Sequence, residues 1–423
     1  MDDRAEFMSM LRGPRAEELL RLTLASTGLE LHSWEFEHIY SRPGAEVSAR
    51  YLTQCSLEGR PAVVRMIVST VVMTEEQRRE IGAVRAESAV GTLHIWAHPV
   101  DPELPGLIVV EGDPTGARGR PGTAELEDRL SAQIGEQVQL RVLELLVLRP
   151  LRRAVYRAVV LSPRGERTLY LKIVRPKRVP TLLIRHMSSP LIPTVIDIGE
   201  GILVLDQAQG LPLVNHLYRP LAPEQGRGID LQVVLAALDT LHPNTVTLPA
   251  RAAPAQRLAG IASEAVAAGA SPSRVAAMTD RLADALAPEP GPLVPTHGDF
   301  HPANVFLDHE ARRPTALIDA DTVGPGYRVD DLATLLAHLL ALPSFDAEGY
   351  RDVPGTLCRF FSQSRMDHDP VDLCARIASV LLSLIPSTHD SVQLEHYLRW
   401  AEDLTGTASP EDLLRSARSG SDG

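Results

Sequence analysis

Alternating apolar and polar residues predict a group of strands near the middle of this chain. Apolar, β-branched and aromatic residues recur at every second position there, as in half-buried strands. The expected strands are 139–148, 153–161, 168–174, 194–198 and 202–205, with a short helix at about 177–188. A turn, Ser162-Pro163-Arg164-Gly165, joins the second strand to the third. The order predicts an antiparallel sheet interrupted by one helix.

The pattern becomes helical from Leu211 onward. The expected helices cover residues 271–287, 330–342, 346–364, 371–386 and 391–405. Ser271 as N-cap and Pro272 at the first helical position mark the start of one of them. Residues 410–423 are rich in Ser, Gly and Asp, and we expect them to fray.

The first 135 residues predict a helix at 15–27 followed by a second meander, which shares a pattern with the later strands. Arg42-Pro43, Arg50, Arg60 and Arg65 recur as Arg149-Pro150, Arg157, Arg167 and Lys172 at a constant offset of 107 residues. Either this region is a cap domain with its own meander, or it is a degenerate repeat of the later sheet with Arg65 in place of Lys172. Chance similarity of two arginine-rich hairpins would also explain the pattern. A capping box at Thr74 opens a further helix, on which we place Glu80 and Glu87.

Composition narrows the classes of protein. The 423-residue chain carries a net charge of −12, which argues against nucleic acid as the main partner. Cys55, Cys358 and Cys374 are few and widely spaced, as expected of thiols in a reducing compartment. The sequence shows neither a secretory signal nor an apolar run of membrane-spanning length, so we expect no membrane and a cytoplasmic location. Only Lys172 and Lys177 among the 42 basic residues are lysines, and a lysine kept in such a chain suggests a required ammonium.

The best functional signal is the stretch THGDFHPANVFLDHEARRPTALIDAD, residues 296–321. Its two apolar runs flank a polar turn and predict a hairpin in which Asp308 faces Thr315 and Asn304 faces Asp319. That register would bring the Asn304 amide and the Asp319 carboxylate together beside Asp299. Such oxygen ligands suit Mg²⁺ and the phosphates that it carries.

The sequence motif HGDFHPAN followed by IDAD resembles that of the aminoglycoside phosphotransferase and choline kinase branch of the kinase-like superfamily. The strong part of the resemblance covers residues 293–335, and residues 135–400 fit its order. The resemblance implies an α+β, bilobal protein-kinase-like fold with an antiparallel N-lobe and a mainly helical C-lobe, here preceded by an α/β cap domain. The expected divisions are 1–135 for the cap, 136–210 for the N-lobe, 211–409 for the C-lobe and 410–423 for a flexible tail.

The resemblance also implies roles for particular residues. Asp299 would be the catalytic base or orienting group, Asn304 and Asp319 would bind Mg²⁺, and Lys172 would contact the phosphates of ATP. By order along the chain, Asp206, Gln207 and Ala208 would lie at the hinge that meets adenine. His297 and His301 would be hydrogen bonders of the loop, Asp321 an auxiliary group, and Asp331 a brace for the loop.

Two features depart from the family pattern. The sequence before Lys172 has no glycine-rich phosphate loop and reads Arg149-Pro150-Leu151-Arg152-Arg153 instead. The helix after Lys172 contains no Glu or Asp, whereas a helix glutamate orients this lysine in kinases. Glu80 or Glu87 of the N-terminal region could supply that partner.

Three functions are compatible with these residues. The first is an ATP- and Mg²⁺-dependent kinase acting on a hydroxyl of a sugar, an aminoglycoside or a related metabolite. The second is a kinase for Ser or Thr of a peptide in natural-product biosynthesis. The third is a catalytically weak pseudokinase that binds nucleotide or a partner protein, which the missing helix acid would favour. The oligomeric state stays open.

Overall fold

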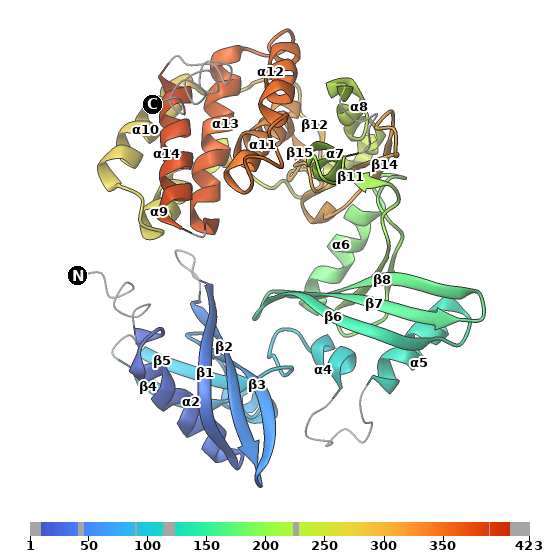
Figure 1. The fold of residues 1–423 in the computed structure, drawn as a ribbon, viewed down its shortest axis with the longest axis vertical. Coiled ribbons are helices and arrows are strands. Elements are labelled where there is room, and N and C mark those ends of the chain that lie inside the picture. Colours follow the sequence, from blue (N-terminus) through green and yellow to red (C-terminus); the bar gives the residue numbers. More distant parts are fainter. Residues whose placement is uncertain are drawn as a thin grey trace. The chain divides into compact units, whose positions relative to one another are not determined.

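A computed structural model of the protein has the α+β class expected from the sequence. It describes residues 10–40, 46–88, 91–112, 123–222, 228–388 and 390–406. The predicted tail, residues 410–423, lies outside them. The chain forms two compact units, Met1–Thr181 with Val195–Gln207 and Leu182–Thr194 with Ala208–Gly423. Each unit is described by itself below (Figure 1).

The first unit holds two five-stranded antiparallel sheets with the same strand order. Sheet A has the order β1-β2-β3-β5-β4 and sheet B the order β6-β7-β8-β10-β9. Sheet A consists of β1 (Leu29–Tyr40), β2 (Ser48–Leu57), β3 (Arg60–Ser69), β4 (Val84–Ser88) and β5 (Gly91–Ala97). Sheet B consists of β6 (Gln139–Arg149), β7 (Arg153–Ser162), β8 (Gly165–Val174), β9 (Val195–Asp197) and β10 (Ile202–Asp206). The strands predicted for sheet B are therefore confirmed, with ends that differ by a few residues.

Helices also occupy equivalent places around the two sheets. One helix precedes each sheet, α2 (Pro14–Ser26) before β1 and α5 (Ala124–Ile134) before β6. Another helix follows the third strand of each sheet, α3 (Glu75–Glu80) after β3 and α6 (Val179–His186) after β8. The capping box predicted at Thr74 is present at the start of α3. Glu87, however, lies in β4 and not in that helix, so its predicted place is wrong.

The repeat is real in strand order, but the predicted offset of 107 residues does not match the strand pairing. Beside the two hairpin turns, Leu57 pairs with Arg60 and Ser162 pairs with Gly165, which sets the offset at 105. Lys172, paired with Val155, then corresponds to Ile67, paired with Arg50, and not to Arg65. Ile67 is a buried apolar residue. Sheet A therefore has no counterpart of the predicted phosphate-contacting lysine at that position.

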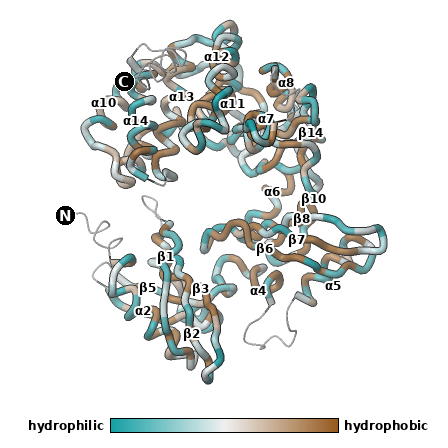
Figure 2. Tube along the Cα trace, viewed as in Figure 1, coloured by the Kyte–Doolittle hydropathy of each residue, from teal (hydrophilic) through white to brown (hydrophobic). Residues whose placement is uncertain are grey.

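Each sheet has its own apolar core. In sheet A, α2 packs its buried side chains, including Leu20 and Leu24, against residues such as Tyr51 and Met66. In sheet B, α5 and the short helix α4 (Gly106–Glu111) cover one face. The strands of sheet B carry hydrophobic residues over much of their length (Figure 2). The amphipathic helices thus cover one face of each antiparallel sheet, the common solution for this architecture.

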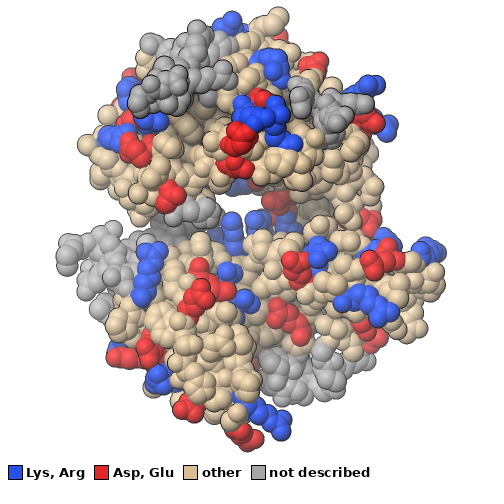
Figure 3. All heavy atoms as spheres, viewed as in Figure 1, with Lys and Arg blue, Asp and Glu red and all other residues tan. Residues whose placement is uncertain are grey.

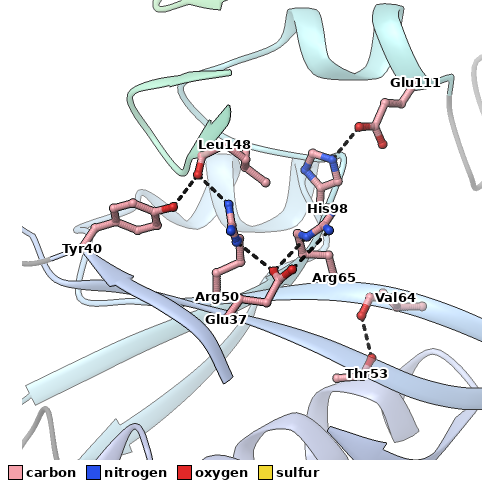
Figure 4. A network of polar contacts seen from close by, with 9 residues as sticks. All are labelled: Glu37, Tyr40, Arg50, Thr53, Val64, Arg65, His98, Glu111 and Leu148. Atoms are coloured by element: carbon pink, nitrogen blue, oxygen red, sulfur yellow. Dashed lines mark hydrogen bonds and ion pairs between the residues drawn. The ribbon is translucent and has the colours of Figure 1, made fainter. Parts of the chain in front are cut away.

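Polar groups join the two sheets. Glu37 on β1 forms ion pairs with Arg50 (2.8 Å) and Arg65 (2.9 Å). Arg50 also donates to the carbonyl of Leu148 on β6 at 2.7 Å, and the Tyr40 hydroxyl donates to the same oxygen at 2.6 Å (Figure 4). Burial acts to raise the pKa of Glu37, but the two guanidinium groups hold it below its usual value. Glu37 thereby positions Arg50, which reaches from sheet A to sheet B.

A second contact lies between the last strand of sheet A and the core of sheet B. His98 follows β5, and its Nε2 lies 2.8 Å from Oε1 of Glu111 at the end of α4. The same oxygen accepts a hydrogen bond from the buried Tyr156 hydroxyl of β7 at 2.5 Å. Nearby, the Asp101 carboxylate accepts the backbone N–H of Leu151 at 2.9 Å. Charged and polar bonds thus hold sheet A to sheet B beside the apolar contact of Leu151 with Ile67 and Trp96.

The second unit is mainly helical, as predicted. Its helices are α7 (Leu213–Leu217), α8 (Leu231–Leu235), α9 (Leu258–Ala267), α10 (Pro272–Ala285), α11 (Arg328–Ala341), α12 (Val353–Ser364), α13 (Pro370–Leu384) and α14 (Ser391–Thr405). Ser271 takes the N-cap position of α10, although its hydroxyl contacts Ser273 and caps no backbone N–H. The helix predicted from residue 346 begins only at Val353, because Pro354 favours the first turn of a helix and not its interior.

The helix α13, extended to Ser387, is the one described segment that is long and apolar enough to cross a membrane. Two-thirds of it is buried within the second unit, where it packs in the core with α11 and α14. It also carries a buried ion pair, in which Arg376 Nε donates to Asp372 at 2.8 Å. Burial and this charge pair are the features of a core helix.

The Glu37 network predicts a localised loss of stability in Glu37→Gln. A neutral amide cannot balance both guanidinium groups, so we expect the contact between the sheets to weaken by about 1–3 kcal/mol. Hydrogen–deuterium exchange should then become faster in β1, β2 and β6. Glu35→Gln is the matched control, because Glu35 is exposed on the same strand. Equal exchange in both variants would show that the network does not hold the sheets together.

Candidate phosphoryl-transfer loop

Short strands of the second unit frame the loop that carries Asp299. β12 (Val294–Thr296) leads into it and pairs with β15 (Gly324–Gly326). β13 (Val305–Leu307) leads out of it and pairs with β14 (Pro314–Leu317) and with β11 (Leu211–Pro212). The predicted hairpin is therefore present, and both ends of the loop are fixed in sheets.

The predicted register of this hairpin is wrong by one residue. Val305 pairs with Leu317, so Asn304 lies opposite Ile318, whose N–H donates to the Asn304 carbonyl at 3.0 Å. At the turn, the Asp308 N–H donates to the Arg313 carbonyl, and the ladder is irregular between Phe306 and Leu307. The Asp308 carboxylate accepts the N–H of Arg312 at 2.8 Å. This side-chain bond tightens the turn, and Asp308 does not face Thr315.

Asp319 therefore leaves the ladder instead of pairing with Asn304. Its backbone is left-handed, with φ 55° and ψ 47°, and it precedes a single 3₁₀ turn at Ala320–Thr322. A left-handed residue other than glycine costs roughly 1–2 kcal/mol, so the surrounding structure has to hold it. The direction of the Asp319 side chain is thus set by this turn and not by the alternation of β14.

Asp331 of α11 holds the start of the loop. Its two carboxylate oxygens accept the backbone N–H groups of His297 and Gly298, each at 2.8 Å. Burial raises the pKa of Asp331 to about 7, against the effect of the two N–H groups. Gly298 has φ +74°, and a side chain there would approach the Thr322 carbonyl to 2.9 Å. Position 298 therefore requires glycine, and its N–H is one of the two that Asp331 accepts.

Asp299 and Asn304 are joined within the loop. The Asn304 side-chain N–H₂ donates to the Asp299 carbonyl at 2.9 Å, which leaves the amide oxygen as the acceptor of that side chain. Asn304 is buried, whereas Asp299 and Asp319 are half-buried. Among the described residues, no group of three His, Cys, Asp or Glu could hold a metal by itself. An amide and a carboxylate fit a Mg²⁺ ion that also binds nucleotide phosphates.

Histidines pack behind the loop. His297 is fully buried, its Nε2 donates to the Ile318 carbonyl at 3.0 Å, and burial lowers its pKa. His301 stacks on His338 of α11, with ring centroids 4.7 Å apart. Burial lowers the pKa of His301 as well, and it lowers that of His338 to about 4. These neutral rings support the loop without adding positive charge beside Asp299.

Hydrogen bonds connect the 3₁₀ turn after Asp319 to the end of α6 (Val179–His186). The Arg185 guanidinium donates to the Val323 carbonyl at 2.9 Å and to the Pro249 carbonyl at 2.8 Å. His186 Nε2 lies 3.4 Å from Asp321. The helix that lacks an acidic residue therefore ends in two residues that bond the turn after Asp319. Sequence reasoning missed them, because an arginine and a histidine at a helix end are ordinary in any chain.

Comparison with known proteins agrees with this loop. Residues 190–353 match the model of the phosphotransferase enzyme family, a range that holds Asp299, Asn304, Asp319 and Asp331. The predicted resemblance is thus confirmed, together with the α+β kinase-like fold of that family. Sheet A lies outside the matched residues. A search of curated protein sequences finds no significant match to the chain.

Solved structures similar to this chain include three kinds of kinase. A thermostable mutant of an aminoglycoside phosphotransferase, solved with ADP and hygromycin B, is 17% identical over 68% of this chain and 100% of its own, with a TM-score of 0.47. A macrolide 2'-phosphotransferase from Brachybacterium faecium is 17% identical over 68% and 98%, with a TM-score of 0.36. A choline/ethanolamine kinase family protein from Mesorhizobium loti is 18% identical over 67% and 95%, with a TM-score of 0.41.

The remaining predicted site residues lie at or before the division between the two units. Lys172 lies on β8 in the first unit, between Val155 and Leu203, and is 5% exposed. The alternation of β8 directs it away from the face that α4 and α5 cover. Asp206 ends β10 and binds Arg167 at 2.7 Å. Gln207 and Ala208 follow at the boundary of the two units, and their hinge role stays a prediction.

The depressed pKa of His338 predicts how acid affects the second unit. Between pH 6.5 and about 4 the unfolded chain binds a proton at this residue that the folded chain excludes. The contribution of neutral His338 to the free energy of unfolding should therefore be complete above pH 6.5. It should be lost as the pH falls toward 4, by at most about 3 kcal/mol.

The measurement is the unfolding free energy of the wild type and of His338→Asn between pH 4 and 7.5. The wild type should gain stability relative to the variant as the pH rises to 6.5, and the difference should then stay constant. A difference that does not change with pH would show that His338 titrates normally.

Proposed function

We propose that the protein transfers the γ-phosphoryl group of ATP to a hydroxyl group of a small molecule, with Mg²⁺ as cofactor. The family match over residues 190–353 supports phosphoryl transfer as the class of reaction. The acceptor class is a sugar, an aminoglycoside or a related metabolite, and the reaction would take place in the cytoplasm. The net charge of −12 is compatible with a cationic acceptor.

The observation that carries the proposal is the doubly anchored loop at Asp299. Asp331 accepts two backbone N–H groups at its start, and Asn304 binds the Asp299 carbonyl near its end. Asp299 itself is left half-buried, with its carboxylate on a backbone that cannot easily move. Phosphoryl transfer depends mainly on positioning and on stabilising charge, so a rigid carboxylate is the group that the reaction requires.

Each residue then has a distinct task. Asp299 accepts the hydrogen bond of the acceptor hydroxyl and orients it toward the phosphorus atom. Asn304 and Asp319 would hold Mg²⁺, which neutralises phosphate charge when it is bound. Lys172 in the first unit would contact the phosphates, and its burial on β8 suits a lysine held in one direction. Arg185 and His186 hold the turn that follows Asp319, which is the part of the site that carries backbone strain.

One observation favours the pseudokinase alternative. The helix α6 contains no acidic residue, and Arg185 and His186 at its end bond the turn after Asp319, within the second unit. A weak or absent turnover with intact nucleotide binding would follow if no other carboxylate orients Lys172. The acceptor panel described next includes a peptide arm and separates all three functions.

Asp299→Asn should reduce phosphoryl transfer by at least about a thousandfold, because removal of the positioned carboxylate leaves the acceptor hydroxyl without its base. ADP release would be measured with Mg²⁺-ATP and panels of sugars, aminoglycosides and Ser/Thr peptides. Nucleotide affinity should stay within about threefold of the wild type, since Asp299 is not a proposed metal ligand.

Asp280→Asn is the control, because Asp280 is exposed on α10. Wild-type turnover in Asp299→Asn would refute the assignment of the base. Binding of Mg²⁺-ATP by the wild type without ADP release under any acceptor would favour the pseudokinase instead.

A further inference from the structure

The second unit contains a pocket that the proposed reaction does not use. Its volume is about 380 Å³, within the range of small-molecule sites. His216 and Leu217 of α7 line one side, and Arg351, Gly355 and Arg359 line the other. α7 also contacts the candidate loop, since the Val214 N–H donates to the Pro302 carbonyl at 3.0 Å. The pocket therefore lies on the element next to that loop, but Asp299, Asn304 and Asp319 do not line it.

The two segments that carry the pocket lining are tied to one another by contacts beside the pocket. The Arg219 N–H donates to the Gly349 carbonyl at 2.8 Å, which ties the end of α7 to the segment before α12. The Tyr218 hydroxyl donates to Asp346 at 3.0 Å, and its ring packs on Tyr350 with centroids 5.0 Å apart. A side chain at Gly349 would meet the Tyr218 ring at 2.0 Å, so glycine is required there.

The lining is positively charged, in contrast to the chain as a whole. Of the described residues that line it, three are arginines and one carries a carboxylate, whereas the chain has a net charge of −12. Arg219 binds that carboxylate, Asp352, at 3.0 Å. Arg351 pairs with Glu348. Arg359 has no carboxylate partner among the described residues, and it donates only to the Thr356 hydroxyl at 3.0 Å.

The start of α12 faces the same space. Asp352 takes the N-cap position of this 12-residue helix, but its side chain caps no backbone N–H and binds Arg219 instead. Gly355 in the first turn leaves the backbone uncovered, with the Arg359 guanidinium close by. In this turn the Val353 N–H donates to the Tyr350 carbonyl at 3.0 Å and Pro354 has no N–H, so Gly355 carries the one N–H of the turn without an acceptor among the described residues. A helix start carries a partial positive charge, which favours a phosphate group. The charge of Arg359 adds to this field.

His216 gives independent support for a ligand. It is 3% exposed and lines the pocket, yet neither ring nitrogen has a hydrogen-bond partner among the described residues. The ring lies near the Leu307 carbonyl without a well-formed bond to it. A buried imidazole without partners is costly, and a ligand oxygen in the pocket would satisfy it.

We propose that this pocket binds the phosphate group of a small molecule. Arg359 and the Gly355 N–H of α12 would hold the phosphate oxygens, and His216 would donate to one of them. A guanidinium and a backbone N–H match the geometry and charge of a phosphate. The site is separate from the residues proposed for catalysis, so the inference does not depend on phosphoryl transfer.

The test is titration of the whole protein with inorganic phosphate and with phenyl phosphate, followed by ³¹P NMR and calorimetry, without nucleotide. We expect saturable binding in the wild type. In Arg359→Gln the dissociation constant should rise at least about tenfold, because one charge-assisted contact is lost. Gly355→Glu should weaken binding similarly, since it places a carboxylate beside Arg359 without an apolar core to disturb.

Arg365→Gln is the matched control, because Arg365 is an exposed arginine at the other end of α12. Tighter binding of phenyl phosphate would identify a phosphorylated small molecule as the ligand, and equal binding would identify free phosphate. The proposal is overturned if the wild type binds neither probe, or if Arg359→Gln and Gly355→Glu bind them as tightly as Arg365→Gln does.

Discussion

The candidate site depends on one buried carboxylate. Asp331 accepts the N–H groups of His297 and Gly298 from within the core of the second unit, where α11 is almost entirely buried. These two bonds place the start of the loop relative to a rigid helix. Everything that follows in the loop, from Asp299 to the Asn304 amide, is positioned from this point. Loss of either bond would leave a buried polar group unsatisfied, which is why the constraint is strong.

The strands around the site could be predicted from the sequence, but the register could not. Apolar runs mark β13 and β14, whereas the pairing depends on how Asp308 closes the turn and on the irregularity after Phe306. Both effects come from single side chains and leave no periodic signal. The left-handed Asp319 was equally hidden, because aspartate adopts that conformation more often than most residues but still rarely. The motif thus predicts which residues form the site. The hairpin turn and the 3₁₀ turn after Asp319 set the directions of their side chains.

The same limit explains the repeat in the first unit. Arginine spacing predicted an offset of 107, whereas the hairpin pairing gives 105, so the recurring arginines do not occupy equivalent places in the two sheets. The shared strand order of the two sheets is the more informative observation. In sheet A the position that corresponds to Lys172 is the buried Ile67, so this sheet stabilises and contacts sheet B without the predicted phosphate-contacting lysine.

Parts of this protein carry local charge of the opposite sign to its net charge of −12. On the face drawn in Figure 3, acidic and basic side chains are interspersed and do not form one large basic area. The Glu37 network and the pocket at α12 are two places where arginines gather. The pocket at α12 could not be predicted from the sequence, because Arg219 lies far along the chain from Arg351 and Arg359. The Glu37 network could not be predicted either, because it depends on the register of β1, β2 and β3.

The most direct test of the central claim is binding of Mn²⁺-ATP, with Mn²⁺ in place of Mg²⁺, followed by electron paramagnetic resonance. It needs no knowledge of the acceptor. The wild type should bind the metal–nucleotide complex, and Asp319→Asn should weaken metal binding at least about tenfold, because the carboxylate is the charged ligand of the proposed pair. Equal binding of Mn²⁺-ATP by the wild type and by Asp319→Asn would contradict a metal-dependent phosphoryl-transfer site at this loop.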